Sequence, residues 1–468
     1  MVFSDLFFLF AFLPALFLLY FLLKNNAYRR AVLTVFSLLF YAWGEPVCIF
    51  LMVGLVAADY GFGLLLSRTA DGKTKKLLLA IAVALNLGVL VFYKYLGFLA
   101  ETWNTVTGLM LRVPEVSMPI GISFFTFQTM SYVIDVYRGD AAVQKSFFRL
   151  LLYVSFFPQL IAGPIVRYKD IEEQLDDRTV TAEDFNEGLF RFARGLFKKV
   201  LLADALDPVV TALYGLGTPT VLAQWAGAAF FTLQLYFDFS GYSDMAIGLG
   251  RMFGFRFLEN FRYPLCASSA TDFWRRWHIS LGSFFRDYVY IPLGGNRRMQ
   301  FRNILVVWFL TGLWHGASWN FILWGLYYAF WLTLEKLFLL RALERLPAIP
   351  RAVISHTGAV LIAVFGFAIF YFDTNLFSEL GAFFGVGCGG ISDIRTLSIL
   401  SENCFLFLVS VLAAVPLVPA LCEKTVSRLS LSPSVQRVCK TAAVFCVFAL
   451  SVVRLAGNSY SPFLYFRF

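Results

Sequence analysis

Long apolar runs separated by short polar connections extend along almost the whole of the 468-residue chain. The first run, LFFLFAFLPALFLLYFLL, extends from Leu6 to Leu23 and is followed closely by Lys24, Arg29 and Arg30. A helix of about 20 apolar residues, at about 1.5 Å per residue, is long enough to cross the hydrocarbon core of a bilayer. The run lacks the basic start and the small-residue cleavage site of a signal peptide, so the pattern predicts a permanent membrane span.

Further apolar runs predict more spans, at residues 31–42, 47–66, 77–96, 119–136, 147–165, 188–205, 221–237, 304–313, 319–339, 353–372, 404–421 and 441–453. Several are too short to cross a bilayer alone, so hydropathy supports roughly 11 transmembrane helices. FPQLIAGPIVRY and WFLTGLWHGASW contain glycine or proline and predict broken or re-entrant helices, which persist at membrane depth where they are buried in protein or line a cavity. The sequence thus predicts an all-α polytopic membrane protein with re-entrant and interfacial helices, forming a single integral-membrane domain over residues 1–468.

One strongly polar stretch interrupts this pattern between residues 170 and 187. Within it, Thr181 is followed three residues later by Asp184, directly before an apolar run. A hydroxyl and a carboxylate at this spacing can satisfy the free backbone N–H groups at a helix start. We therefore predict that Thr181 and Asp184 cap the next helix.

The composition supports the membrane assignment, because 59% of the residues are hydrophobic, 18% are aromatic and only 15% are charged. The net charge of +9 comes from basic residues that lie between apolar runs, as in cytoplasmic loops. The pattern therefore predicts a protein of the lipid bilayer that does not bind nucleic acid. The 7 cysteines show no CxxC spacing, and no metal-ligand cluster is evident, so we expect neither a bound metal nor a disulfide framework.

Two of the 3 histidines lie between Thr271 and Trp319, in the densest cluster of arginine and tryptophan. His315 interrupts the apolar segment VVWFLTGLWHGASWNFILWGL, where a group that titrates near neutral pH is costly to hold unless it is used. The alternative is a histidine that hydrogen-bonds between helices. His278, in WRRWHISL, lies in a belt of aromatic and basic residues, where a structural role fits the pattern equally well. Both are candidate catalytic residues.

A second polar cluster directly follows an apolar run, in YFDFSGYSDMAIGLGRMFG. It contains Asp238, Ser240, Tyr242 and Asp244, and carboxylates at membrane depth usually pair with a cation or a hydroxyl. One interpretation is that these residues hold a broken helix together. The other is that they orient a histidine or line the path of a polar substrate.

The loop VYIPLGGNRR lies in a region from Arg275 to Arg302 where basic residues outnumber acidic ones. By the positive-inside rule, the ends of this region face the cytoplasm. The positive charge could serve only to set the topology. It could also attract an anionic acyl donor, such as coenzyme A through its phosphates.

Two long motifs of this region, DFWRRWHISLGSFFRDYVYIPLGGNR and FLTGLWHGASWNFILWGLYYA, resemble the signature of the membrane-bound O-acyltransferase (MBOAT) family. The branch that they resemble most is that of the alginate O-acetyltransferase membrane subunit. PIGISFFTFQTMSYVIDVYRG, FFPQLIAGPIVRY, YFDFSGYSDMAIGLGRMFGF and the terminal SPFLYFRF also fit this branch. The resemblance therefore covers nearly the whole chain.

The resemblance implies a ring of tilted transmembrane helices around a thin central region, with a channel in which a donor from one side meets an acceptor from the other. It assigns catalysis to His315, and His278 matches the second histidine that this branch retains. A general base is what attack on an activated thioester requires, so no cofactor needs to be bound, and an acyl-histidine intermediate is less favoured. Neighbouring side chains are expected to support the site or line the substrate path, namely Trp274, Arg275, Arg276, Trp314 and Asn320.

For function, the resemblance implies an acetyltransferase subunit of the bacterial cytoplasmic (inner) membrane. The donor would be acetyl-CoA or another acyl thioester, and an extracytoplasmic acetyltransferase partner protein would complete transfer to a polysaccharide or cell-wall glycan. One alternative is an acyltransferase of the same fold with a teichoic-acid, lipid or protein acceptor. A second is a transporter or flippase in which His315, Asp238 and Asp244 relay protons. Consumption of a thioester distinguishes the acyltransferases from the transporter.

Overall fold

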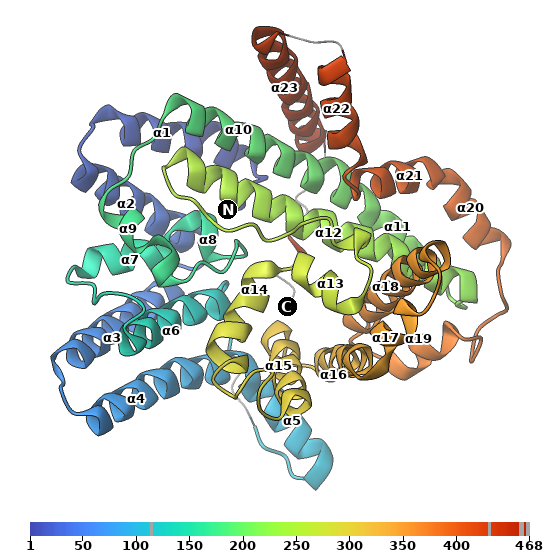
Figure 1. Ribbon diagram of the computed structural model, residues 1–468, viewed down its shortest axis with the longest axis horizontal. Helices are drawn as coiled ribbons and strands as arrows, with labels where there is room; N and C mark the ends of the chain where they lie inside the picture. The colour runs from blue at the N-terminus through green and yellow to red at the C-terminus, as the bar shows by residue number, and fades with distance from the viewer. Residues whose placement is uncertain (113–115, 429–431, 458–462, 465–468) are drawn as a thin grey trace. The chain divides into compact units, whose positions relative to one another are not determined.

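The computed structural model describes residues 1–112, 116–428, 432–457 and 463–464. These residues form helices joined by loops and turns, and the described part of the chain contains no strand (Figure 1). The terminal motif SPFLYFRF lies outside the described residues except for Phe463 and Leu464. The contacts divide the chain into two compact units, Met1–Phe192 with Tyr242–Leu258, and Ala193–Gly241 with Glu259–Phe468.

The first unit is built from the amino-terminal helices. Two of them begin where a side chain accepts hydrogen bonds from the first turn, since Asn25 caps the helix from Asn26 and Asp71 caps the helix from Gly72. The helices are α1 (Leu13–Leu22), α2 (Asn26–Gly44), α3 (Cys48–Arg68), α4 (Gly72–Leu90), α5 (Leu96–Thr107), α6 (Ile122–Arg138), α7 (Phe147–Ser155), α8 (Phe157–Leu160) and α9 (Tyr168–Asp176), with the π-helical segments η1 (Phe8–Phe12) and η2 (Val91–Tyr95).

Helix α6 lies at the centre of the first unit, because most of its residues are buried and both α3 and α4 pack against it. A side chain at Gly63 of α3 would clash with the hydroxyl of Tyr132 on α6, so this glycine permits the close approach. A buried polar chain joins the three helices. The Asn86 amide donates to the Asp59 carboxylate at 2.8 Å, and the Thr129 hydroxyl donates to the Asn86 oxygen at 2.7 Å.

Helices α10 (Ala182–Phe197) and α12 (Val221–Met252) each contribute to both units. The second unit also contains α11 (Asp204–Tyr214), α13 (Ala270–Arg276), α14 (Ile279–Phe285), α15 (Gln300–His315), α16 (Trp319–Leu334), α17 (Leu340–Glu344), α18 (Ala348–Tyr371), α19 (Leu376–Ala382), α20 (Ile394–Glu402), α21 (Cys404–Ala413), α22 (Leu417–Arg428) and α23 (Pro433–Gly457). Short π and 3-10 segments join them, namely η3 (Lys198–Ala203), η4 (Pro264–Cys266), η5 (Arg286–Tyr290) and η6 (Glu335–Leu339).

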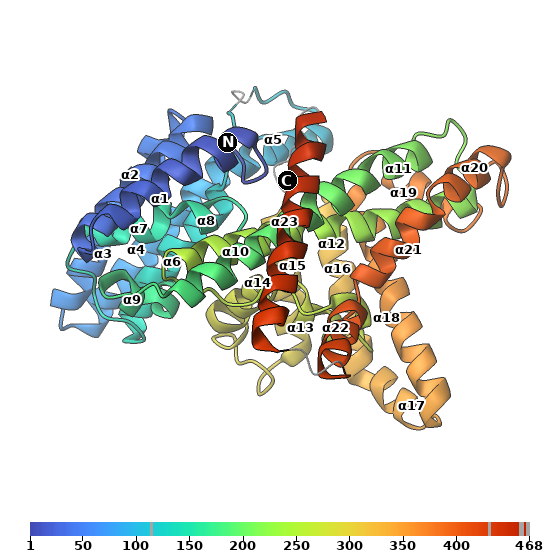
Figure 2. The same ribbon diagram turned by 90° about the horizontal axis from the view of Figure 1, so that it is seen from above.

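Helices α15 and α16 pack closely against each other in the second unit, because each contributes a glycine to the contact. A Cβ atom at Gly312 would clash with the carbonyl oxygen of Phe321, and one at Gly325 would clash with that of Trp308. Small residues let two helix backbones approach in this way. Helix α18 packs on the other side of α16, and the two lie side by side in Figure 2. This packing fixes the end of α15, where His315 lies.

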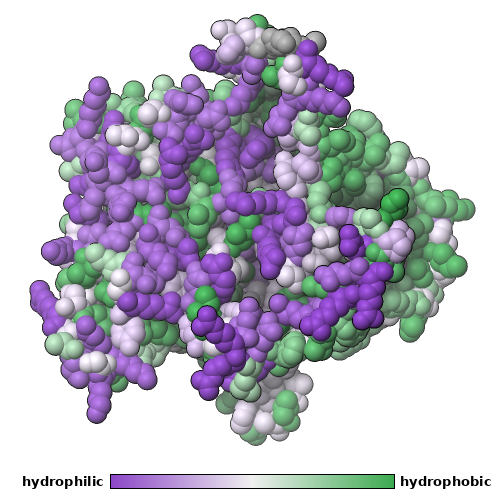
Figure 3. All heavy atoms as spheres, in the orientation of Figure 1, coloured by the Kyte–Doolittle hydropathy of each residue, from purple (hydrophilic) through white to green (hydrophobic). Residues whose placement is uncertain are grey.

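Five helices of the described residues are long and apolar enough to cross a membrane, namely Cys48–Arg68, Gly72–Thr107, Trp319–Glu344, Ala348–Tyr371 and Pro433–Gly457. The bent pair Ile394–Glu402 and Cys404–Ala413 gives a sixth if it forms one span. The predicted roughly 11 spans also count shorter runs, and one of these, Phe8–Leu22, is a shorter apolar helix. Figure 3 shows hydrophobic side chains gathered over α20, where Ile394 and Leu397 are exposed as expected for a lipid-facing surface.

Both helix interruptions predicted from glycine and proline are present in the structure. The apolar run from residue 147 is broken into α7 and α8, and the segment around His315 is broken between α15 and α16, as predicted. The interpretation that Asp238 and Asp244 hold a broken helix together is wrong, because α12 continues unbroken from Val221 to Met252. Its glycines permit close packing instead, since a Cβ atom at Gly241 would lie 2.8 Å from the Gly195 carbonyl oxygen.

The predicted cap of α10 is confirmed. The Asp184 backbone N–H donates to the Thr181 hydroxyl at 3.0 Å, and that hydroxyl donates to the Asp184 carboxylate at 2.8 Å. The helix starts at Ala182, directly after the cap. The hydrogen bond from Thr181 lowers the pKa of the Asp184 carboxyl, and Arg251 and Arg256 lower it further.

Candidate active site

His315 is the last residue of α15, and it is only 6% exposed. The helix ends there because Gly316 adopts an extended backbone and α16 starts at Trp319. The imidazole is surrounded by aromatic rings from three helices. Its ring centroid lies 5.0 Å from that of Trp314, 4.9 Å from that of Trp324 and 5.2 Å from that of Phe370. The cage holds the imidazole in a nearly dry environment.

His278 lies between α13 and α14 and is 1% exposed. Its backbone is left-handed, with φ of 46°, which is uncommon for a residue other than glycine. The imidazole Nδ1 lies 3.2 Å from the side-chain oxygen of Asn260, which also accepts hydrogen bonds from the backbone N–H and the hydroxyl of Ser280. Because an amide oxygen only accepts, Nδ1 carries the proton in this bond and Nε2 presents its lone pair.

Burial lowers the pKa of His278 to about 3, so the ring is neutral near pH 7. Position 278 lies outside the candidate membrane spans. A neutral imidazole with its proton on Nδ1 can accept a hydrogen bond at Nε2 but cannot donate one there. The geometry therefore suits His278 to accept a hydrogen bond at Nε2 from an N–H or O–H group of a substrate.

Trp314 joins the two histidines. Its ring centroid lies 5.7 Å from that of His278, and His315 follows it directly in the chain. The ring of Phe239, on α12, also contacts His278, with its centroid 4.7 Å from that of the imidazole. The structure thus brings together His278, His315 and Trp314, which the sequence placed in two separate motifs.

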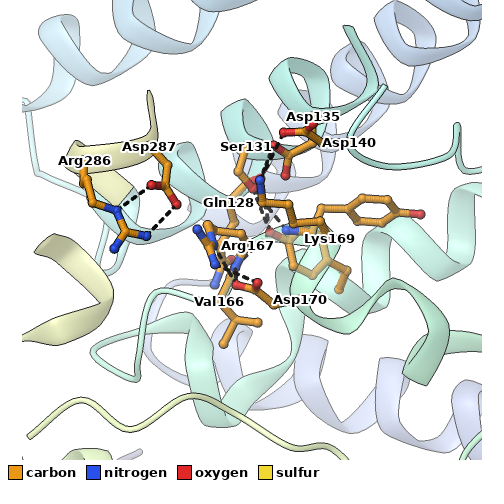
Figure 4. Close-up of polar contacts among 12 residues, drawn as sticks. Gln128, Ser131, Asp135, Asp140, Val166, Arg167, Lys169, Asp170, Arg286 and Asp287 are labelled. Atoms are coloured by element: carbon orange, nitrogen blue, oxygen red, sulfur yellow. Dashed lines mark hydrogen bonds and ion pairs between the residues drawn. The ribbon is translucent and has the colours of Figure 1, made fainter. Parts of the chain in front are cut away.

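A cavity of about 500 Å³ opens beside His278, within the second unit. Its cationic lining comes from Arg275, Arg286 and Lys336, and Arg286 pairs with the neighbouring Asp287 at 2.7 Å (Figure 4). Aromatic rings make up a second part of the lining, namely Trp274, Trp277, Phe285, Tyr290 and Trp308. The lining includes His278 but not His315. A ligand with an anionic end and an apolar end fits this distribution of side chains.

Four aromatic side chains, Trp274, Trp308, Trp324 and Tyr328, form one cluster that connects the cavity lining to His315. The ring centroid of Trp274 lies 4.7 Å from that of Trp308, 5.4 Å from that of Trp324 and 4.8 Å from that of Tyr328. Trp274 and Trp308 line the cavity, whereas Trp324 contacts the imidazole of His315. Through this cluster, residues that line the cavity contact a residue that packs against His315.

The profile of the family described as MBOAT, membrane-bound O-acyltransferase family, matches residues 125–371. The probable alginate O-acetylase AlgI of Azotobacter vinelandii is 39% identical over 100% of this chain and 100% of its own length. The chain belongs to the membrane-bound O-acyltransferase family.

Two further relatives widen the comparison. The peptidoglycan O-acetyltransferase of Helicobacter pylori is 32% identical over 100% of this chain and 98% of its own length. The teichoic acid D-alanyltransferase of Bacillus subtilis is 29% identical over 47% of this chain and 59% of its own length. The chain is thus an O-acyltransferase and a multi-pass membrane protein with an all-α fold, as the motifs predicted.

In this MBOAT protein, the two carboxylates that the sequence singled out on α12, Asp238 and Asp244, have salt-bridge partners. In the second unit, the Asp238 carboxylate lies 2.7 Å from the Lys199 ammonium and accepts a hydrogen bond from the Leu464 backbone N–H at 3.0 Å. Lys199 also pairs with Asp204 at 2.8 Å. Ser240 is buried on the same helix. Asp238 thus connects α12 to Lys199 and to the backbone of Leu464.

Asp244 and Tyr242 belong to the first unit. The Asp244 carboxylate pairs with the Arg191 guanidinium at 3.0 Å, and the Tyr242 ring stacks on that of Phe3 with centroids 4.7 Å apart. These contacts are of the kind that hold helices together. They give no observation in favour of a substrate path at these two residues.

The remaining predicted residues lie around the histidines in the second unit. Arg275 is exposed at the cavity, and Arg276 pairs with Asp272 of the same helix at 2.9 Å. The Asn320 amide donates to the Phe370 carbonyl at 3.1 Å, and the Phe370 ring contacts His315. Asn320 therefore helps to fix one ring of the cage.

Two residues near the site were missed from the sequence. The buried Glu335 carboxylate accepts hydrogen bonds from the backbone N–H groups of Ala270 and Thr271 and from the Thr271 hydroxyl, at the start of α13. Asn260 holds His278. A carboxylate at the end of the apolar run 319–339 was the available signal for Glu335, since such residues usually have a role. No sequence signal pointed to Asn260.

Two other motif stretches, residues 119–139 and 156–168, meet in the first unit. The Tyr168 backbone N–H donates to the Ser131 hydroxyl at 3.3 Å. Beside it, Lys169 pairs with Asp140 at 3.1 Å and Arg167 pairs with Asp170 at 2.8 Å (Figure 4). These motifs are therefore accounted for by packing and ion pairs within the first unit.

Proposed function

We propose that the chain takes an acyl group, most simply acetyl, from a cytoplasmic thioester and passes it across the membrane for O-acetylation of an exported or cell-wall polysaccharide. The observation that carries this proposal is the pair of buried histidines joined by Trp314 beside a cavity with cationic and aromatic lining. The names of the full-length relatives, an alginate O-acetylase and a peptidoglycan O-acetyltransferase, support the acetyl group and the glycan acceptor.

The donor would occupy the cavity beside His278. Phosphates on acetyl-CoA, or on another acyl thioester, would be attracted to Arg275, Arg286 and Lys336, while the apolar lining would accommodate the thioester end. The aromatic part of the lining would also limit the access of water that would hydrolyse the thioester. The donor approaches from the cytoplasmic side because the region from Arg275 to Arg302 is rich in basic residues.

His315 would serve as the general base. The acceptor hydroxyl oxygen attacks the acyl carbon while its proton moves to the imidazole of His315, and the carbon–sulfur bond then breaks. The departing thiolate takes the proton from the imidazolium, so the histidine ends neutral. General-base assistance of this kind contributes roughly 10² to 10⁴-fold in rate. His278 would position the donor through Nε2, since its Nδ1 proton is used by Asn260.

The transfer would take place in the bacterial cytoplasmic membrane, and an extracytoplasmic acetyltransferase partner would deliver the group to the glycan. A second candidate uses a carrier-borne acyl group and a teichoic-acid acceptor, because about half of the chain is similar to a teichoic acid D-alanyltransferase. A proton-relay transporter is not supported, since Asp238 and Asp244 are each paired with a basic residue.

The test is turnover of labelled acetyl-CoA by the purified protein in nanodiscs, with and without a candidate glycan and partner protein. We expect His315→Ala to abolish turnover while the protein remains monodisperse, and His278→Asn to raise KM for the donor. Wild-type turnover that is unchanged by His315→Ala would refute the assignment of the base. Consumption of a D-alanyl carrier thioester but not of acetyl-CoA would select the second candidate.

A further inference from the structure

In the proposed reaction, the carbonyl oxygen of the acyl thioester is the one reacting atom that has no assigned partner in the protein. When the acceptor oxygen bonds to the acyl carbon, this oxygen becomes negatively charged, and acyl transfer then requires a hydrogen-bond donor placed close to it. His278 cannot fill this role, because its Nε2 presents a lone pair. The hydrogen-bond donor for this oxygen must therefore come from another side chain close to His315.

Three polar side chains repeat along one face of α16, at Asn320, Trp324 and Tyr328. Their four-residue spacing places them in a row on the helix surface. They are 2%, 1% and 0% exposed, respectively. Each has one polar atom that finds no hydrogen-bond partner among the described residues, namely Asn320 Oδ1, Trp324 Nε1 and the Tyr328 hydroxyl. A buried donor without a partner is unfavourable unless water or a ligand satisfies it.

Only one of these atoms is both a donor and part of a ring that contacts the base. The Trp324 ring lies 4.9 Å from that of His315 and 5.4 Å from that of the cavity residue Trp274. The Asn320 atom is an acceptor. The Tyr328 hydroxyl lies against Gly366 of α18, where a Cβ atom would clash with it.

We propose that the Trp324 indole N–H donates a hydrogen bond to the thioester carbonyl oxygen and stabilises the oxyanion that forms as the acceptor attacks. Trp324 is then a catalytic residue, and it acts in the same step as His315 but on a different atom. The imidazole takes the proton of the acceptor hydroxyl, and the indole N–H holds the charge on the acyl oxygen until the carbon–sulfur bond breaks. This inference rests on the proposed function.

The competing explanation is structural. The indole N–H could point at the face of a neighbouring aromatic ring, which is a weak hydrogen bond of its own. Trp324 meets Tyr328 at 75° and Trp274 at 85°, so both rings are available for such a contact. In that case the N–H would contribute to packing and not to the reaction.

Trp324→Phe separates the two explanations, because phenylalanine keeps an aromatic ring and removes the N–H. We expect kcat for acetyl-CoA turnover to fall roughly 10²- to 10³-fold with KM unchanged, since the oxyanion exists only in the transition state. Trp331→Phe on the same helix is the matched control. Its ring contacts Tyr327 and Phe330, and it should retain wild-type kcat.

A second variant excludes a folding defect. Incorporation of β-(3-benzothienyl)alanine at position 324 keeps the bicyclic shape and replaces the N–H by sulfur, and it should give the same loss of kcat with an unchanged unfolding midpoint. Full kcat in this variant would overturn the oxyanion role while leaving the proposed function intact. Absence of thioester turnover in the wild type would instead overturn the proposed function.

Discussion

The side-chain oxygen of Asn260 lies 3.2 Å from Nδ1 of His278 and also accepts two hydrogen bonds from Ser280. One amide oxygen therefore fixes both the tautomer of the imidazole and the first turn of α14. Both Asn260 and His278 are buried, so their bond is shielded from competing water. The orientation of His278 depends on a residue that belongs to neither of the two recognised histidine motifs.

Asn260→Ala should weaken catalysis through His278. The variant removes the acceptor for the Nδ1 proton and leaves buried donors of Ser280 without their partner, which costs about 1–3 kcal/mol of stability. We expect KM for acetyl-CoA to rise and the unfolding midpoint to fall. Asn296→Ala is the control, since Asn296 lines the same cavity but bonds to Tyr290. Equal effects of the two substitutions on KM would contradict the role of Asn260.

Lys199 should be a major determinant of stability in the second unit. Its side chain is 4% exposed and its ammonium pairs with Asp204 and Asp238, so Lys199→Met removes the cation from the buried Asp238 carboxylate and from the partly buried Asp204 carboxylate. Breaking a buried pair in this way costs about 3–5 kcal/mol. Thermal unfolding in detergent should show a large fall in the midpoint of Lys199→Met. The triple variant that combines Lys199→Met with Asp204→Asn and Asp238→Asn should recover part of this loss. Lys198→Met, at the less buried neighbouring lysine, should have a smaller effect, and an equal effect would refute the prediction.

Stability should fall in weak acid because of His278. Burial lowers the pKa of its imidazole from 6.5 to about 3 in the folded protein, so the unfolded chain binds this proton between those two values while the folded chain does not. Stability therefore rises with pH in this window and is lost as the pH falls. By about pH 5 the loss is about 2 kcal/mol, at about 1.4 kcal/mol per pKa unit.

The check on this prediction is the unfolding midpoint of the wild type and of His278→Asn between neutral pH and about pH 5. Asparagine does not titrate, so the midpoint of the variant should fall less than that of the wild type. Parallel decreases in the two proteins would show that other groups determine the acid sensitivity.

Gly325→Ala should displace His315 indirectly, through the packing of α15 against α16. The new methyl group would clash with the carbonyl oxygen of Trp308 and force α15 away from α16. Overpacking of this kind costs about 1–3 kcal/mol, and turnover should fall because the aromatic cage around His315 opens. Gly358→Ala on α18 meets no atom within 4 Å and serves as the control. Retained turnover in Gly325→Ala would show that the site tolerates separation of the helices.

The sequence predicted those features that depend on neighbouring residues. Apolar runs located the long helices, Thr181 and Asp184 located the start of α10, and the segment WFLTGLWHGASW predicted the break between α15 and α16. Partners distant in the chain could not be predicted in this way. Hydropathy shows that Asp238 and Glu335 lie in or beside apolar runs, but it does not show that they meet Lys199 and the start of α13.

The glycines of α12 help to explain why the interpretation of Asp238 and Asp244 as parts of a broken helix was wrong. Glycine lowers helix propensity, and a cluster of glycines near carboxylates is compatible with a broken helix. In the folded chain, Gly241 lies against the Gly195 carbonyl and Gly248 against that of Gly188, so each permits a close helix contact. Tertiary packing compensates for the low propensity, and only the folded arrangement shows which partner does so.

The left-handed backbone of His278 limits which amino acids can occupy this position, independently of chemistry. At φ of 46° a β-branched or bulky side chain is strained, whereas glycine and asparagine adopt this conformation readily. Alanine at 278 would therefore change the shape of the loop as well as remove the imidazole, and the two effects could not be separated. Asparagine retains the loop and a polar side chain, so a library at this position should be enriched in asparagine and glycine among its well-folded members and depleted in valine and isoleucine.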